Sequence, residues 1–237
     1  MGFTASVYTP RPLAEQDRGQ RGPAGIIRIV HTARSVREFA TALASAEPAP
    51  GGGGGAALAG ALGAALAAMV CNFTIGRKRY QAVDAEMRAL LSRADAIREE
   101  LIGLVDADAD AYEKVVEAQG LPKDTADQIA ERDRRVQAAL AEAVRVPLRG
   151  AVLCADALAL CEPVAERGNQ RLISDAGVAA LLADAALQSC ALNVRVNLSD
   201  LRDERLASES RAALARLLGA AREVKPRVMG LVEKKLP

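Results

Sequence analysis

The sequence predicts an all-α protein: an up-and-down bundle of long helices around a buried helix rich in Ala and Gly, expected to be dimeric. Composition is the first reason, because 50% of the 237 residues are hydrophobic while only 3% are aromatic. Small aliphatic side chains let helices approach closely, whereas strands favour β-branched and aromatic residues. The second reason is that apolar residues recur every three or four positions through most of the chain, which is the period of an amphipathic helix.

Residues 1–30 are predicted to be a disordered tail, and residues 31–237 to form the helical domain. The tail is rich in Gly, Pro and Arg and offers little apolar surface to bury. It lacks the continuous apolar stretch of a secretory signal peptide, and we expect a cytoplasmic protein. A first helix is expected from Ser35, because Ser with Glu38 three residues later forms a capping box. This helix should end before Pro48.

The second expected helix, from Ala56 to about Thr74, is the centre of the predicted bundle because it carries no charged residue. A helix that is apolar on every side is either buried in a protein or spans a membrane. Its length would just cross a bilayer, but it consists mainly of Ala and Gly, which drive insertion less than Leu, Ile or Phe do. We therefore predict burial and no membrane association. Such a helix needs partners on all sides, which indicates a homodimer.

The rest of the chain predicts three further long segments of helix. A long amphipathic helix is expected from Tyr80 to about Gln119 and another from about Thr125 to Leu160, with a kink at Pro147 because proline removes a backbone hydrogen bond. A third should begin at Ser174 or Asp175. The stretch 192–201 alternates like a strand but has no partner strand, so we expect it to continue the helix into a turn. A final helix is expected over about 204–232.

Charge and residue counts exclude several classes of function. The 31 Lys and Arg residues balance the 30 Asp and Glu residues, and no basic stripe interleaved with aromatic residues indicates nucleic-acid binding. His31 is the single histidine, which removes Ser-His-Asp, Cys-His and HExxH chemistry. Acid–base work must therefore fall to carboxylates, Lys, Tyr or water. The four cysteines form no CxxC pair and are expected to be buried, reduced thiols.

A run of five glycines, Gly51 to Gly55, leads directly into the expected central helix. The free N–H groups and positive dipole end of a helix N-terminus can hold an anion or a carbonyl-rich ring, and glycine allows close approach. The run is not a P-loop, because no Lys-Ser/Thr follows it, and it is not a GxGxxG motif after a strand. By spacing alone, both a flexible connector and a ligand-binding turn fit.

Three aspartates, Asp106, Asp108 and Asp110, alternate with alanine late in the long helix. In a helix Asp106 and Asp110 share a face while Asp108 points elsewhere. One interpretation is a solvated acidic face. The other is that Asp106, directly after Leu104 and Val105, is a carboxylate beside an apolar surface, whose pKa would be raised into a useful range. Helical spacing scatters the three carboxylates, which argues against a metal site.

Two further pairs of polar residues are candidates for ligand contacts. Arg77 and Lys78 follow the central helix and either recognise carboxylates or form a solvated C-terminal cap. Asn193 and Asn197 lie one helical turn apart among apolar residues. A buried Asn needs hydrogen-bond partners, so both a structural and a ligand-binding role remain open.

Five segments resemble the cyclodeaminase/cyclohydrolase family, in the right order and over about Ser35 to Leu206. They are PAPGGGGGAALAGALGAALAAMVCNFTIGRKRY, LVDADADAY, ERDRRVQAALAEAVRVPL, SDAGVAALLADAA and ALNVRVNLSDLRD. That family includes the cyclodeaminase domain of formiminotransferase-cyclodeaminase and stand-alone bacterial methenyltetrahydrofolate cyclohydrolases. The resemblance implies an all-α fold that dimerises through packed helices and binds folate near the subunit interface.

The resemblance also implies roles for particular residues. The family's catalytic aspartate, first in its V-D-A-D-A segment, falls on Asp106. Its glycine-rich turn falls on Pro50, Gly51, Gly52 and Gly53, where many members carry Ser at the position of Gly54. Its G-[RK]-[RK] segment implies substrate-binding roles for Arg77 and Lys78, and its N-V-x-x-N segment implies them for Asn193 and Asn197.

The resulting hypothesis is a methenyltetrahydrofolate cyclohydrolase that hydrolyses 5,10-methenyltetrahydrofolate to 10-formyltetrahydrofolate, with an aspartate as general acid and base. It requires no metal or redox cofactor, and the folate is the substrate. The first alternative is a formimidoyltetrahydrofolate cyclodeaminase, which would release ammonia from the same kind of pocket. The second is a non-catalytic helical dimer that only binds folate.

Overall fold

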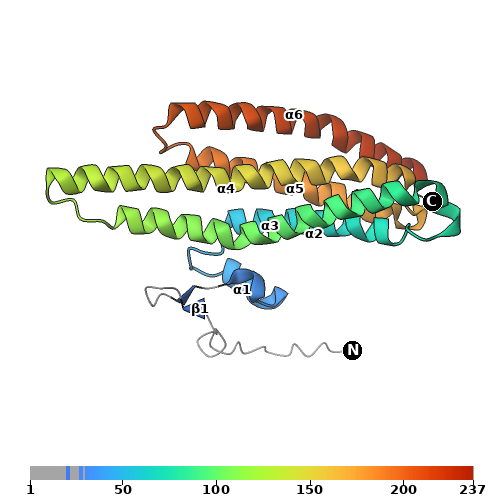
Figure 1. Ribbon diagram of the computed structural model, residues 1–237, viewed down its shortest axis with the longest axis horizontal. Coiled ribbons are helices and arrows are strands. Elements are labelled where there is room, and N and C mark those ends of the chain that lie inside the picture. The colour runs from blue at the N-terminus through green and yellow to red at the C-terminus, as the bar shows by residue number, and fades with distance from the viewer. Residues whose placement is uncertain (1–19, 22–26, 29, 237) are drawn as a thin grey trace, which may run out of the picture.

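The computed structural model describes residues 20–21, 27–28 and 30–236, and helices dominate this part of the chain. Six α-helices are present in it, and five of them form the up-and-down bundle seen in Figure 1. Strands β1 (Gln20–Arg21) and β2 (Ile27–Arg28), which precede the bundle in the sequence, pair antiparallel. This ladder falls within the predicted tail, but most of residues 1–30 lie outside the described residues. The prediction of a disordered tail therefore stays a prediction.

A short N-terminal unit precedes the bundle. It consists of a 3₁₀ helix, η2 (His31–Ala33), and helix α1 (Val36–Leu43). The capping box predicted at Ser35 and Glu38 is present. Phe39 of α1 is buried against Ala57 and Val105, so α1 packs where the second and third helices meet.

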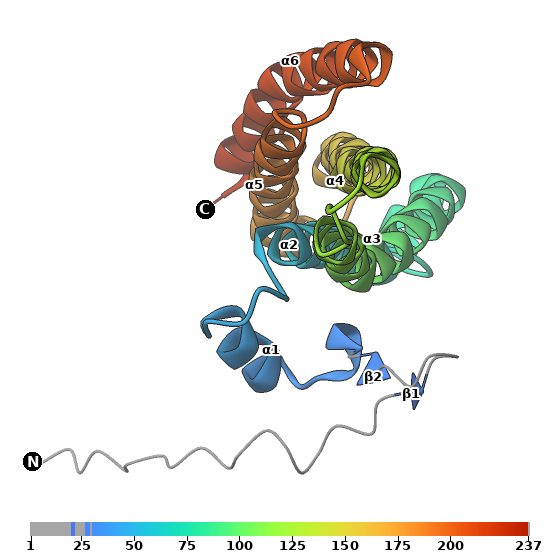
Figure 2. The same cartoon turned by 90° about the vertical axis from the view of Figure 1, so that its left-hand side faces the viewer.

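Helix α2 (Gly52–Asn72) is the buried centre of the bundle, as predicted. Figure 2 shows it end-on between the neighbouring helices. Two of its glycines allow neighbouring helices to pack closely against α2. A Cβ on Gly60 would meet Cys154 Sγ at 2.6 Å, and a Cβ on Gly63 would meet Ala179 O at 3.0 Å. The predicted start at Ala56 is wrong, because Gly51 is the N-cap and the glycines that follow already form the first turn.

Helices α3 (Asp84–Gln119), α4 (Ala126–Arg167), α5 (Ile173–Asn197) and α6 (Glu204–Lys235) complete the bundle. A 3₁₀ helix, η3 (Lys78–Val83), precedes α3, so the helix predicted from Tyr80 begins later. Helix α4 continues through Pro147 and Pro163, beyond the predicted end at Leu160. Helix α5 follows the 3₁₀ helix η4 (Gln170–Leu172).

The caps of α4 and α5 differ from each other. Thr125 caps α4 through a capping box with Gln128, as expected. The N-cap of α5 is Leu172, which has no side-chain cap, so the prediction of Ser174 or Asp175 as its cap is wrong. The end of α5 confirms that the stretch from residue 192 continues the helix into a turn rather than forming a strand.

Two segments are long and apolar enough to cross a membrane, namely α2 and residues 170–197. The apolar window of α2 is 61% buried in the protein and that of the second segment 50%. Packing between helices therefore accounts for much of their apolar surface, which agrees with a helix at the core of the bundle.

The four cysteines, Cys71, Cys154, Cys161 and Cys190, are buried and free, as predicted. Burial raises the pKa of the Cys71 thiol to about 11 and that of Cys161 to about 12. These two side chains are therefore neutral at physiological pH and belong to the core rather than to a reactive site.

Candidate functional site

A cavity of about 340 Å³ lies at the N-terminal end of α2. This volume falls in the range of small-molecule sites, roughly 300–1,000 Å³. Its wall combines the turn before α2 with α3, α4 and α5, which are far apart in the sequence. The residues that line it include Gly51, Gly52, Gly53, Asp108, Asn193, Asn197 and Asp200.

The glycine turn brings the backbone of α2 against a carboxylate of α3. The N–H of Gly54 donates to Asp108 Oδ2 at 2.9 Å. A Cβ on Gly53 would overlap the Asp108 carboxylate, so only glycine leaves room for it at this position. The first turn of α2 thus uses one of its unpaired N–H groups to hold an anion, as helix N-termini commonly do.

Asp108 is a partly desolvated carboxylate in the wall of the cavity. Burial raises its pKa, and the hydrogen bond from Gly54 N–H partly offsets this rise. A carboxyl with a raised pKa gives and takes protons more readily near neutral pH than an exposed one. Raised pKa values in a cleft mark functional sites more often than average positions do. Asp108 is therefore a candidate general acid and base.

Asp106, the residue expected to be catalytic, faces the N-terminal unit instead of this cavity. Its Oδ1 accepts a hydrogen bond from the backbone N–H of His31, and its Oδ2 accepts one from the Thr32 hydroxyl, each at 2.6 Å. Two residues along an α-helix correspond to a turn of roughly 200°, so Asp106 and Asp108 point in nearly opposite directions. The geometry does not bring Asp106 together with the other predicted site residues.

The sequence carries a signal that distinguishes Asp108 from Asp106. The apolar stripe of α3 runs through Leu101, Leu104 and Val105, each of which belongs to or packs against the core. Three and four positions further on, the same stripe reaches residue 108. An acidic residue that continues an apolar stripe is forced towards the core, whereas Asp106 lies off the stripe.

Asn193 and Asn197 both line the cavity, and their role in binding a ligand stays a prediction. Asn193 Nδ2 donates to Ser189 O at 2.9 Å, and Asn197 Nδ2 donates to Ala143 O at 2.6 Å. Main-chain carbonyls thus fix both amide groups by their NH₂ ends. In the described part of the chain no hydrogen bond reaches either Oδ1, so each oxygen is available to accept a bond from a ligand.

Of the four residues predicted to form a ligand-binding turn, three lie in the cavity wall and Pro50 does not. Gly51, Gly52 and Gly53 line the cavity. Pro50 follows a cis peptide bond and is buried. A Cβ built on Gly54 would lie 3.8 Å from Pro50 Cβ, so this proline packs behind the turn rather than facing the cavity.

Arg77 and Lys78 lie at the opposite end of α2 from the glycine turn. Both are exposed and follow the last residue of that helix, Asn72. A helix of 21 residues is about 30 Å long at 1.5 Å per residue. Within one chain these cations are therefore too distant to contact a ligand in the cavity.

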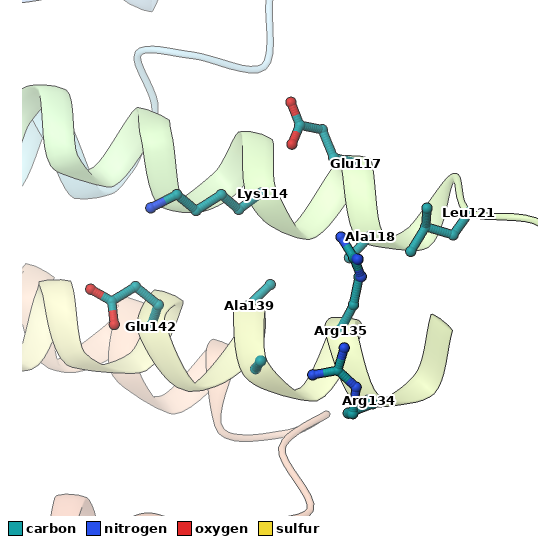
Figure 3. Close-up of a pocket in the computed structure, with 9 residues that line it drawn as sticks. Lys114, Glu117, Ala118, Leu121, Arg134, Arg135, Ala139 and Glu142 are labelled. Carbon is teal, nitrogen blue, oxygen red and sulfur yellow. The ribbon is translucent and has the colours of Figure 1, made fainter. Parts of the chain in front are cut away.

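A second, wider pocket of about 590 Å³ lies between the C-terminal part of α3 and the N-terminal part of α4, as Figure 3 shows. Lys114, Glu117 and Glu142 give its lining mixed charge. Arg134 and Arg135, which also line it, are both paired with Glu131, at 2.8 and 2.6 Å. None of the predicted site residues reaches this pocket, and the cavity at the glycine turn remains the candidate site.

Similar proteins carry names from folate chemistry. A methenyltetrahydrofolate cyclohydrolase from Methylorubrum extorquens is 44% identical over 202 residues, which cover 85% of this chain and 97% of the relative. A formimidoyltransferase-cyclodeaminase from Gallus gallus is 36% identical over 83% of this chain, although the matched part spans only 36% of that protein.

The fold is also found in a solved structure. The crystal structure of formiminotetrahydrofolate cyclodeaminase from Thermotoga maritima matches with a TM-score of 0.77 and 32% identity, covering 85% of this chain and 97% of that one. Residues 35–216, which include the glycine turn, Asp108 and both asparagines, match the Formiminotransferase-cyclodeaminase family. The chain therefore belongs to the formiminotransferase-cyclodeaminase family.

Proposed function

We propose that this chain is a methenyltetrahydrofolate cyclohydrolase that converts 5,10-methenyltetrahydrofolate and water into 10-formyltetrahydrofolate. One structural observation carries the proposal: the Asp108 carboxylate, whose pKa is raised by burial, lies in the cavity wall against the glycine turn. The 44% identity to a methenyltetrahydrofolate cyclohydrolase over nearly the whole of that relative supports the choice of substrate.

The chemistry requires one group that moves a proton twice. The methenyl carbon is an electrophilic, cationic amidinium-type centre, and water adds to it. Asp108 in its ionised form stabilises the cation and takes a proton from the attacking water. When the bond from this carbon to N5 breaks, the protonated Asp108 returns the proton to N5. The hydroxyl group of the adduct then loses its own proton to solvent as the C=O bond forms, and the formyl group remains on N10. The carboxylate ends the cycle as it began.

The asparagines and the glycine turn have complementary roles in this scheme. The Oδ1 atoms of Asn193 and Asn197 accept hydrogen bonds from N–H groups of the pterin ring. The absence of side chains at Gly51 and Gly52 lets a flat ring approach the backbone. Together these groups hold the substrate so that the methenyl carbon faces Asp108.

Two substitutions separate the aspartates. Asp108→Asn is expected to reduce the rate of methenyl absorbance loss by about 10²–10⁴-fold, the usual contribution of a general acid or base. Asp106→Asn is expected to retain turnover, because Asp106 binds the N-terminal unit. Full turnover by Asp108→Asn together with loss in Asp106→Asn would instead assign the proton transfers to Asp106, as the family resemblance implies.

A second candidate function is cyclodeamination of 5-formiminotetrahydrofolate. It is favoured by the similarity to the Thermotoga maritima structure and the Gallus gallus protein, both of which are named for this activity. Ammonia release from the formimino substrate measures it directly. Release much faster than methenyl hydrolysis would make cyclodeamination the main activity. Folate binding without turnover of either substrate would indicate a non-catalytic binding protein.

We also propose that the working unit is a homodimer formed through the exposed side of α2. This side, the α2 stripe, consists of Leu58, Leu62, Leu66, Met69 and Phe73. Leu62 is 51% exposed and Phe73 49% exposed, and no charged residue occurs anywhere in α2. Leu58, Leu66 and Met69 between and beside them are half-buried. Exposed apolar residues along a side of a helix that carries no charge usually mark an interface. Light scattering after size exclusion should give twice the chain mass of 24.8 kDa, and a single-chain mass would contradict the proposal.

A further inference from the structure

Two exposed apolar side chains lie in the wall of the cavity at the glycine turn. Tyr112 of α3 is 46% exposed and Val196 of α5 is 69% exposed, and both line the cavity. Neither belongs to the buried core of the bundle, and Tyr112 is the one aromatic side chain among the described residues of this wall. Apolar side chains exposed in a pocket commonly contact its ligand, because binding removes them from water.

These two side chains lie about one helical turn beyond the glycine turn. Asp108 and Asn193 both lie at that turn, the first hydrogen-bonded to it and the second with its Oδ1 3.9 Å from a Cβ built on Gly52. Tyr112 follows Asp108 by four residues and Val196 follows Asn193 by three. Both spacings place the side chains on one face of a helix, about 5–6 Å apart.

The start of α2 explains why there is space between the two side chains. Helices α3 and α5 run in the same direction in this up-and-down bundle, because each is antiparallel to α4 (Figure 1). Both continue past the point where α2 begins at Gly52, to Gln119 and Asn197. Beyond the glycine turn no part of α2 fills the space between them. Tyr112 and Val196 therefore lie at a similar level, on two different walls of that space.

The proposed substrate has an aryl ring beside its reacting carbon. In 5,10-methenyltetrahydrofolate this carbon joins N5 to N10, and N10 is the amino nitrogen of the p-aminobenzoyl group. The pterin occupies the half-buried side of the cavity, at Asn193 and Asn197. The other end of the substrate carries a glutamate, which remains in water because the charged residues that line the cavity, among those described, are Asp108 and Asp200. The aryl ring between these two ends therefore lies on the exposed side, where Tyr112 is.

We propose that Tyr112 and Val196 form an aryl clamp that holds the p-aminobenzoyl ring of the substrate between them. This ring bears a carbonyl group and is bonded to the cationic amidinium, so it is poor in electrons, whereas the phenol ring of Tyr112 is rich in them. Stacking of the two rings is therefore favourable, and the Val196 methyl groups cover the other face. The inference rests on the proposed function, because only a folate brings this ring to the cavity.

Substitutions at the aryl clamp should change KM rather than kcat. The aryl ring takes no part in the bonds that form and break, so its contacts are the same in the ground state and the transition state. Tyr112→Ala is expected to raise KM by about 10-fold, through lost stacking and lost apolar burial. Tyr112→Phe keeps the ring and should restore most of the lost affinity. Val196→Ala is expected to raise KM by about 3-fold.

A shortened substrate identifies the part of the folate that the aryl clamp contacts. In this analogue the 5,10-methenyl ring system is kept and a methyl group on N10 replaces the aryl ring with its glutamate. Its KM should not respond to Tyr112→Ala or Val196→Ala, because the contact is already missing. An equal rise in KM for both substrates would place Tyr112 against the pterin and overturn the proposal. A rise in Tyr112→Phe as large as in Tyr112→Ala would overturn it too, since the hydroxyl would then make the contact.

Val116→Ala is the matched control. Val116 is 48% exposed, one turn beyond Tyr112 on α3, and is not among the residues that line the cavity. This variant should keep the wild-type KM, and a rise as large as that in Tyr112→Ala would contradict a specific contact. Wild-type protein that turns over neither compound would count against the proposed function instead. Dissociation constants of the two compounds would then replace KM, and equal effects of Tyr112→Ala on both would again overturn the aryl clamp.

Discussion

Adding one methyl group at Gly53 is predicted to remove activity without unfolding the protein. A Cβ at this position would overlap all three terminal atoms of the Asp108 side chain. Because these atoms are the end of a side chain, the carboxylate can rotate away while the α2 and α3 backbones stay in place. The Gly54 N–H would then lose its bond to Asp108 Oδ2, and the carboxylate would leave its position in the cavity.

The expected free energies nearly cancel. Replacing glycine by alanine within a helix stabilises it by about 1 kcal/mol, and losing the partly exposed hydrogen bond costs about 1–2 kcal/mol. The free energy of unfolding should therefore change by no more than about 1 kcal/mol. Turnover should fall by about 10²-fold or more, because a displaced general base no longer reaches the attacking water.

Thermal unfolding and the loss of methenyl absorbance measure the two quantities in Gly53→Ala. The matched control is Gly103→Ala, also in a helix, where an added Cβ would meet no atom within 4 Å. It should keep full turnover and gain about 1 kcal/mol of stability. Wild-type turnover in Gly53→Ala would refute the argument that the position of the Asp108 carboxylate determines the rate.

Three further predictions concern stability and the N-terminal contact. Folding raises the pKa of Asp108, so the wild-type protein loses stability as pH rises through that pKa. Asp108→Asn should therefore have a higher Tm than the wild type at pH 7, and this difference in Tm should shrink towards pH 4. A difference in Tm that does not change with pH would contradict this. Gly63→Ala should lower the free energy of unfolding by about 1–3 kcal/mol, because its Cβ would meet Ala179 O at 3.0 Å. Chemical denaturation measures this change, and an unchanged free energy of unfolding would refute close packing between α2 and α5. Thr32→Val removes the hydroxyl that donates a hydrogen bond to Asp106. It should lower the free energy of unfolding by about 1 kcal/mol or less and leave kcat unchanged. A large fall in kcat would instead link Asp106 to the chemistry.

The helices could be predicted because the residues that indicate them lie close together in the sequence. The capping boxes at Ser35 and Thr125 depend on residues three positions apart and are both present. The uncharged α2 could be predicted as the core by the same kind of reasoning. Its start could not, because glycine is a poor helix former. The contacts of this first turn with Asp108 of α3 and Leu43 of α1 come from segments distant in the sequence.

The roles predicted for the site residues stay predictions, and their arrangement depends on contacts between distant segments. Asn193 and Asn197 are polar interruptions of an apolar helix, and they do line the cavity. The choice between Asp106 and Asp108 depends on which side of α3 meets α2, and the apolar stripe would have indicated it. The distance of Arg77 and Lys78 from the cavity follows from the length of α2, which places them at the opposite end of that helix.

The most direct test of the account is a crystal structure of Asp108→Asn with bound 5,10-methenyltetrahydrofolate, because this variant should hydrolyse the ligand slowly. The account predicts electron density for the pterin between the glycine turn and Asn193. The methenyl carbon should lie close enough to residue 108 for one water molecule to bridge them. Density in the pocket between α3 and α4, or beside Asp106 with the cavity at the glycine turn empty, would contradict it.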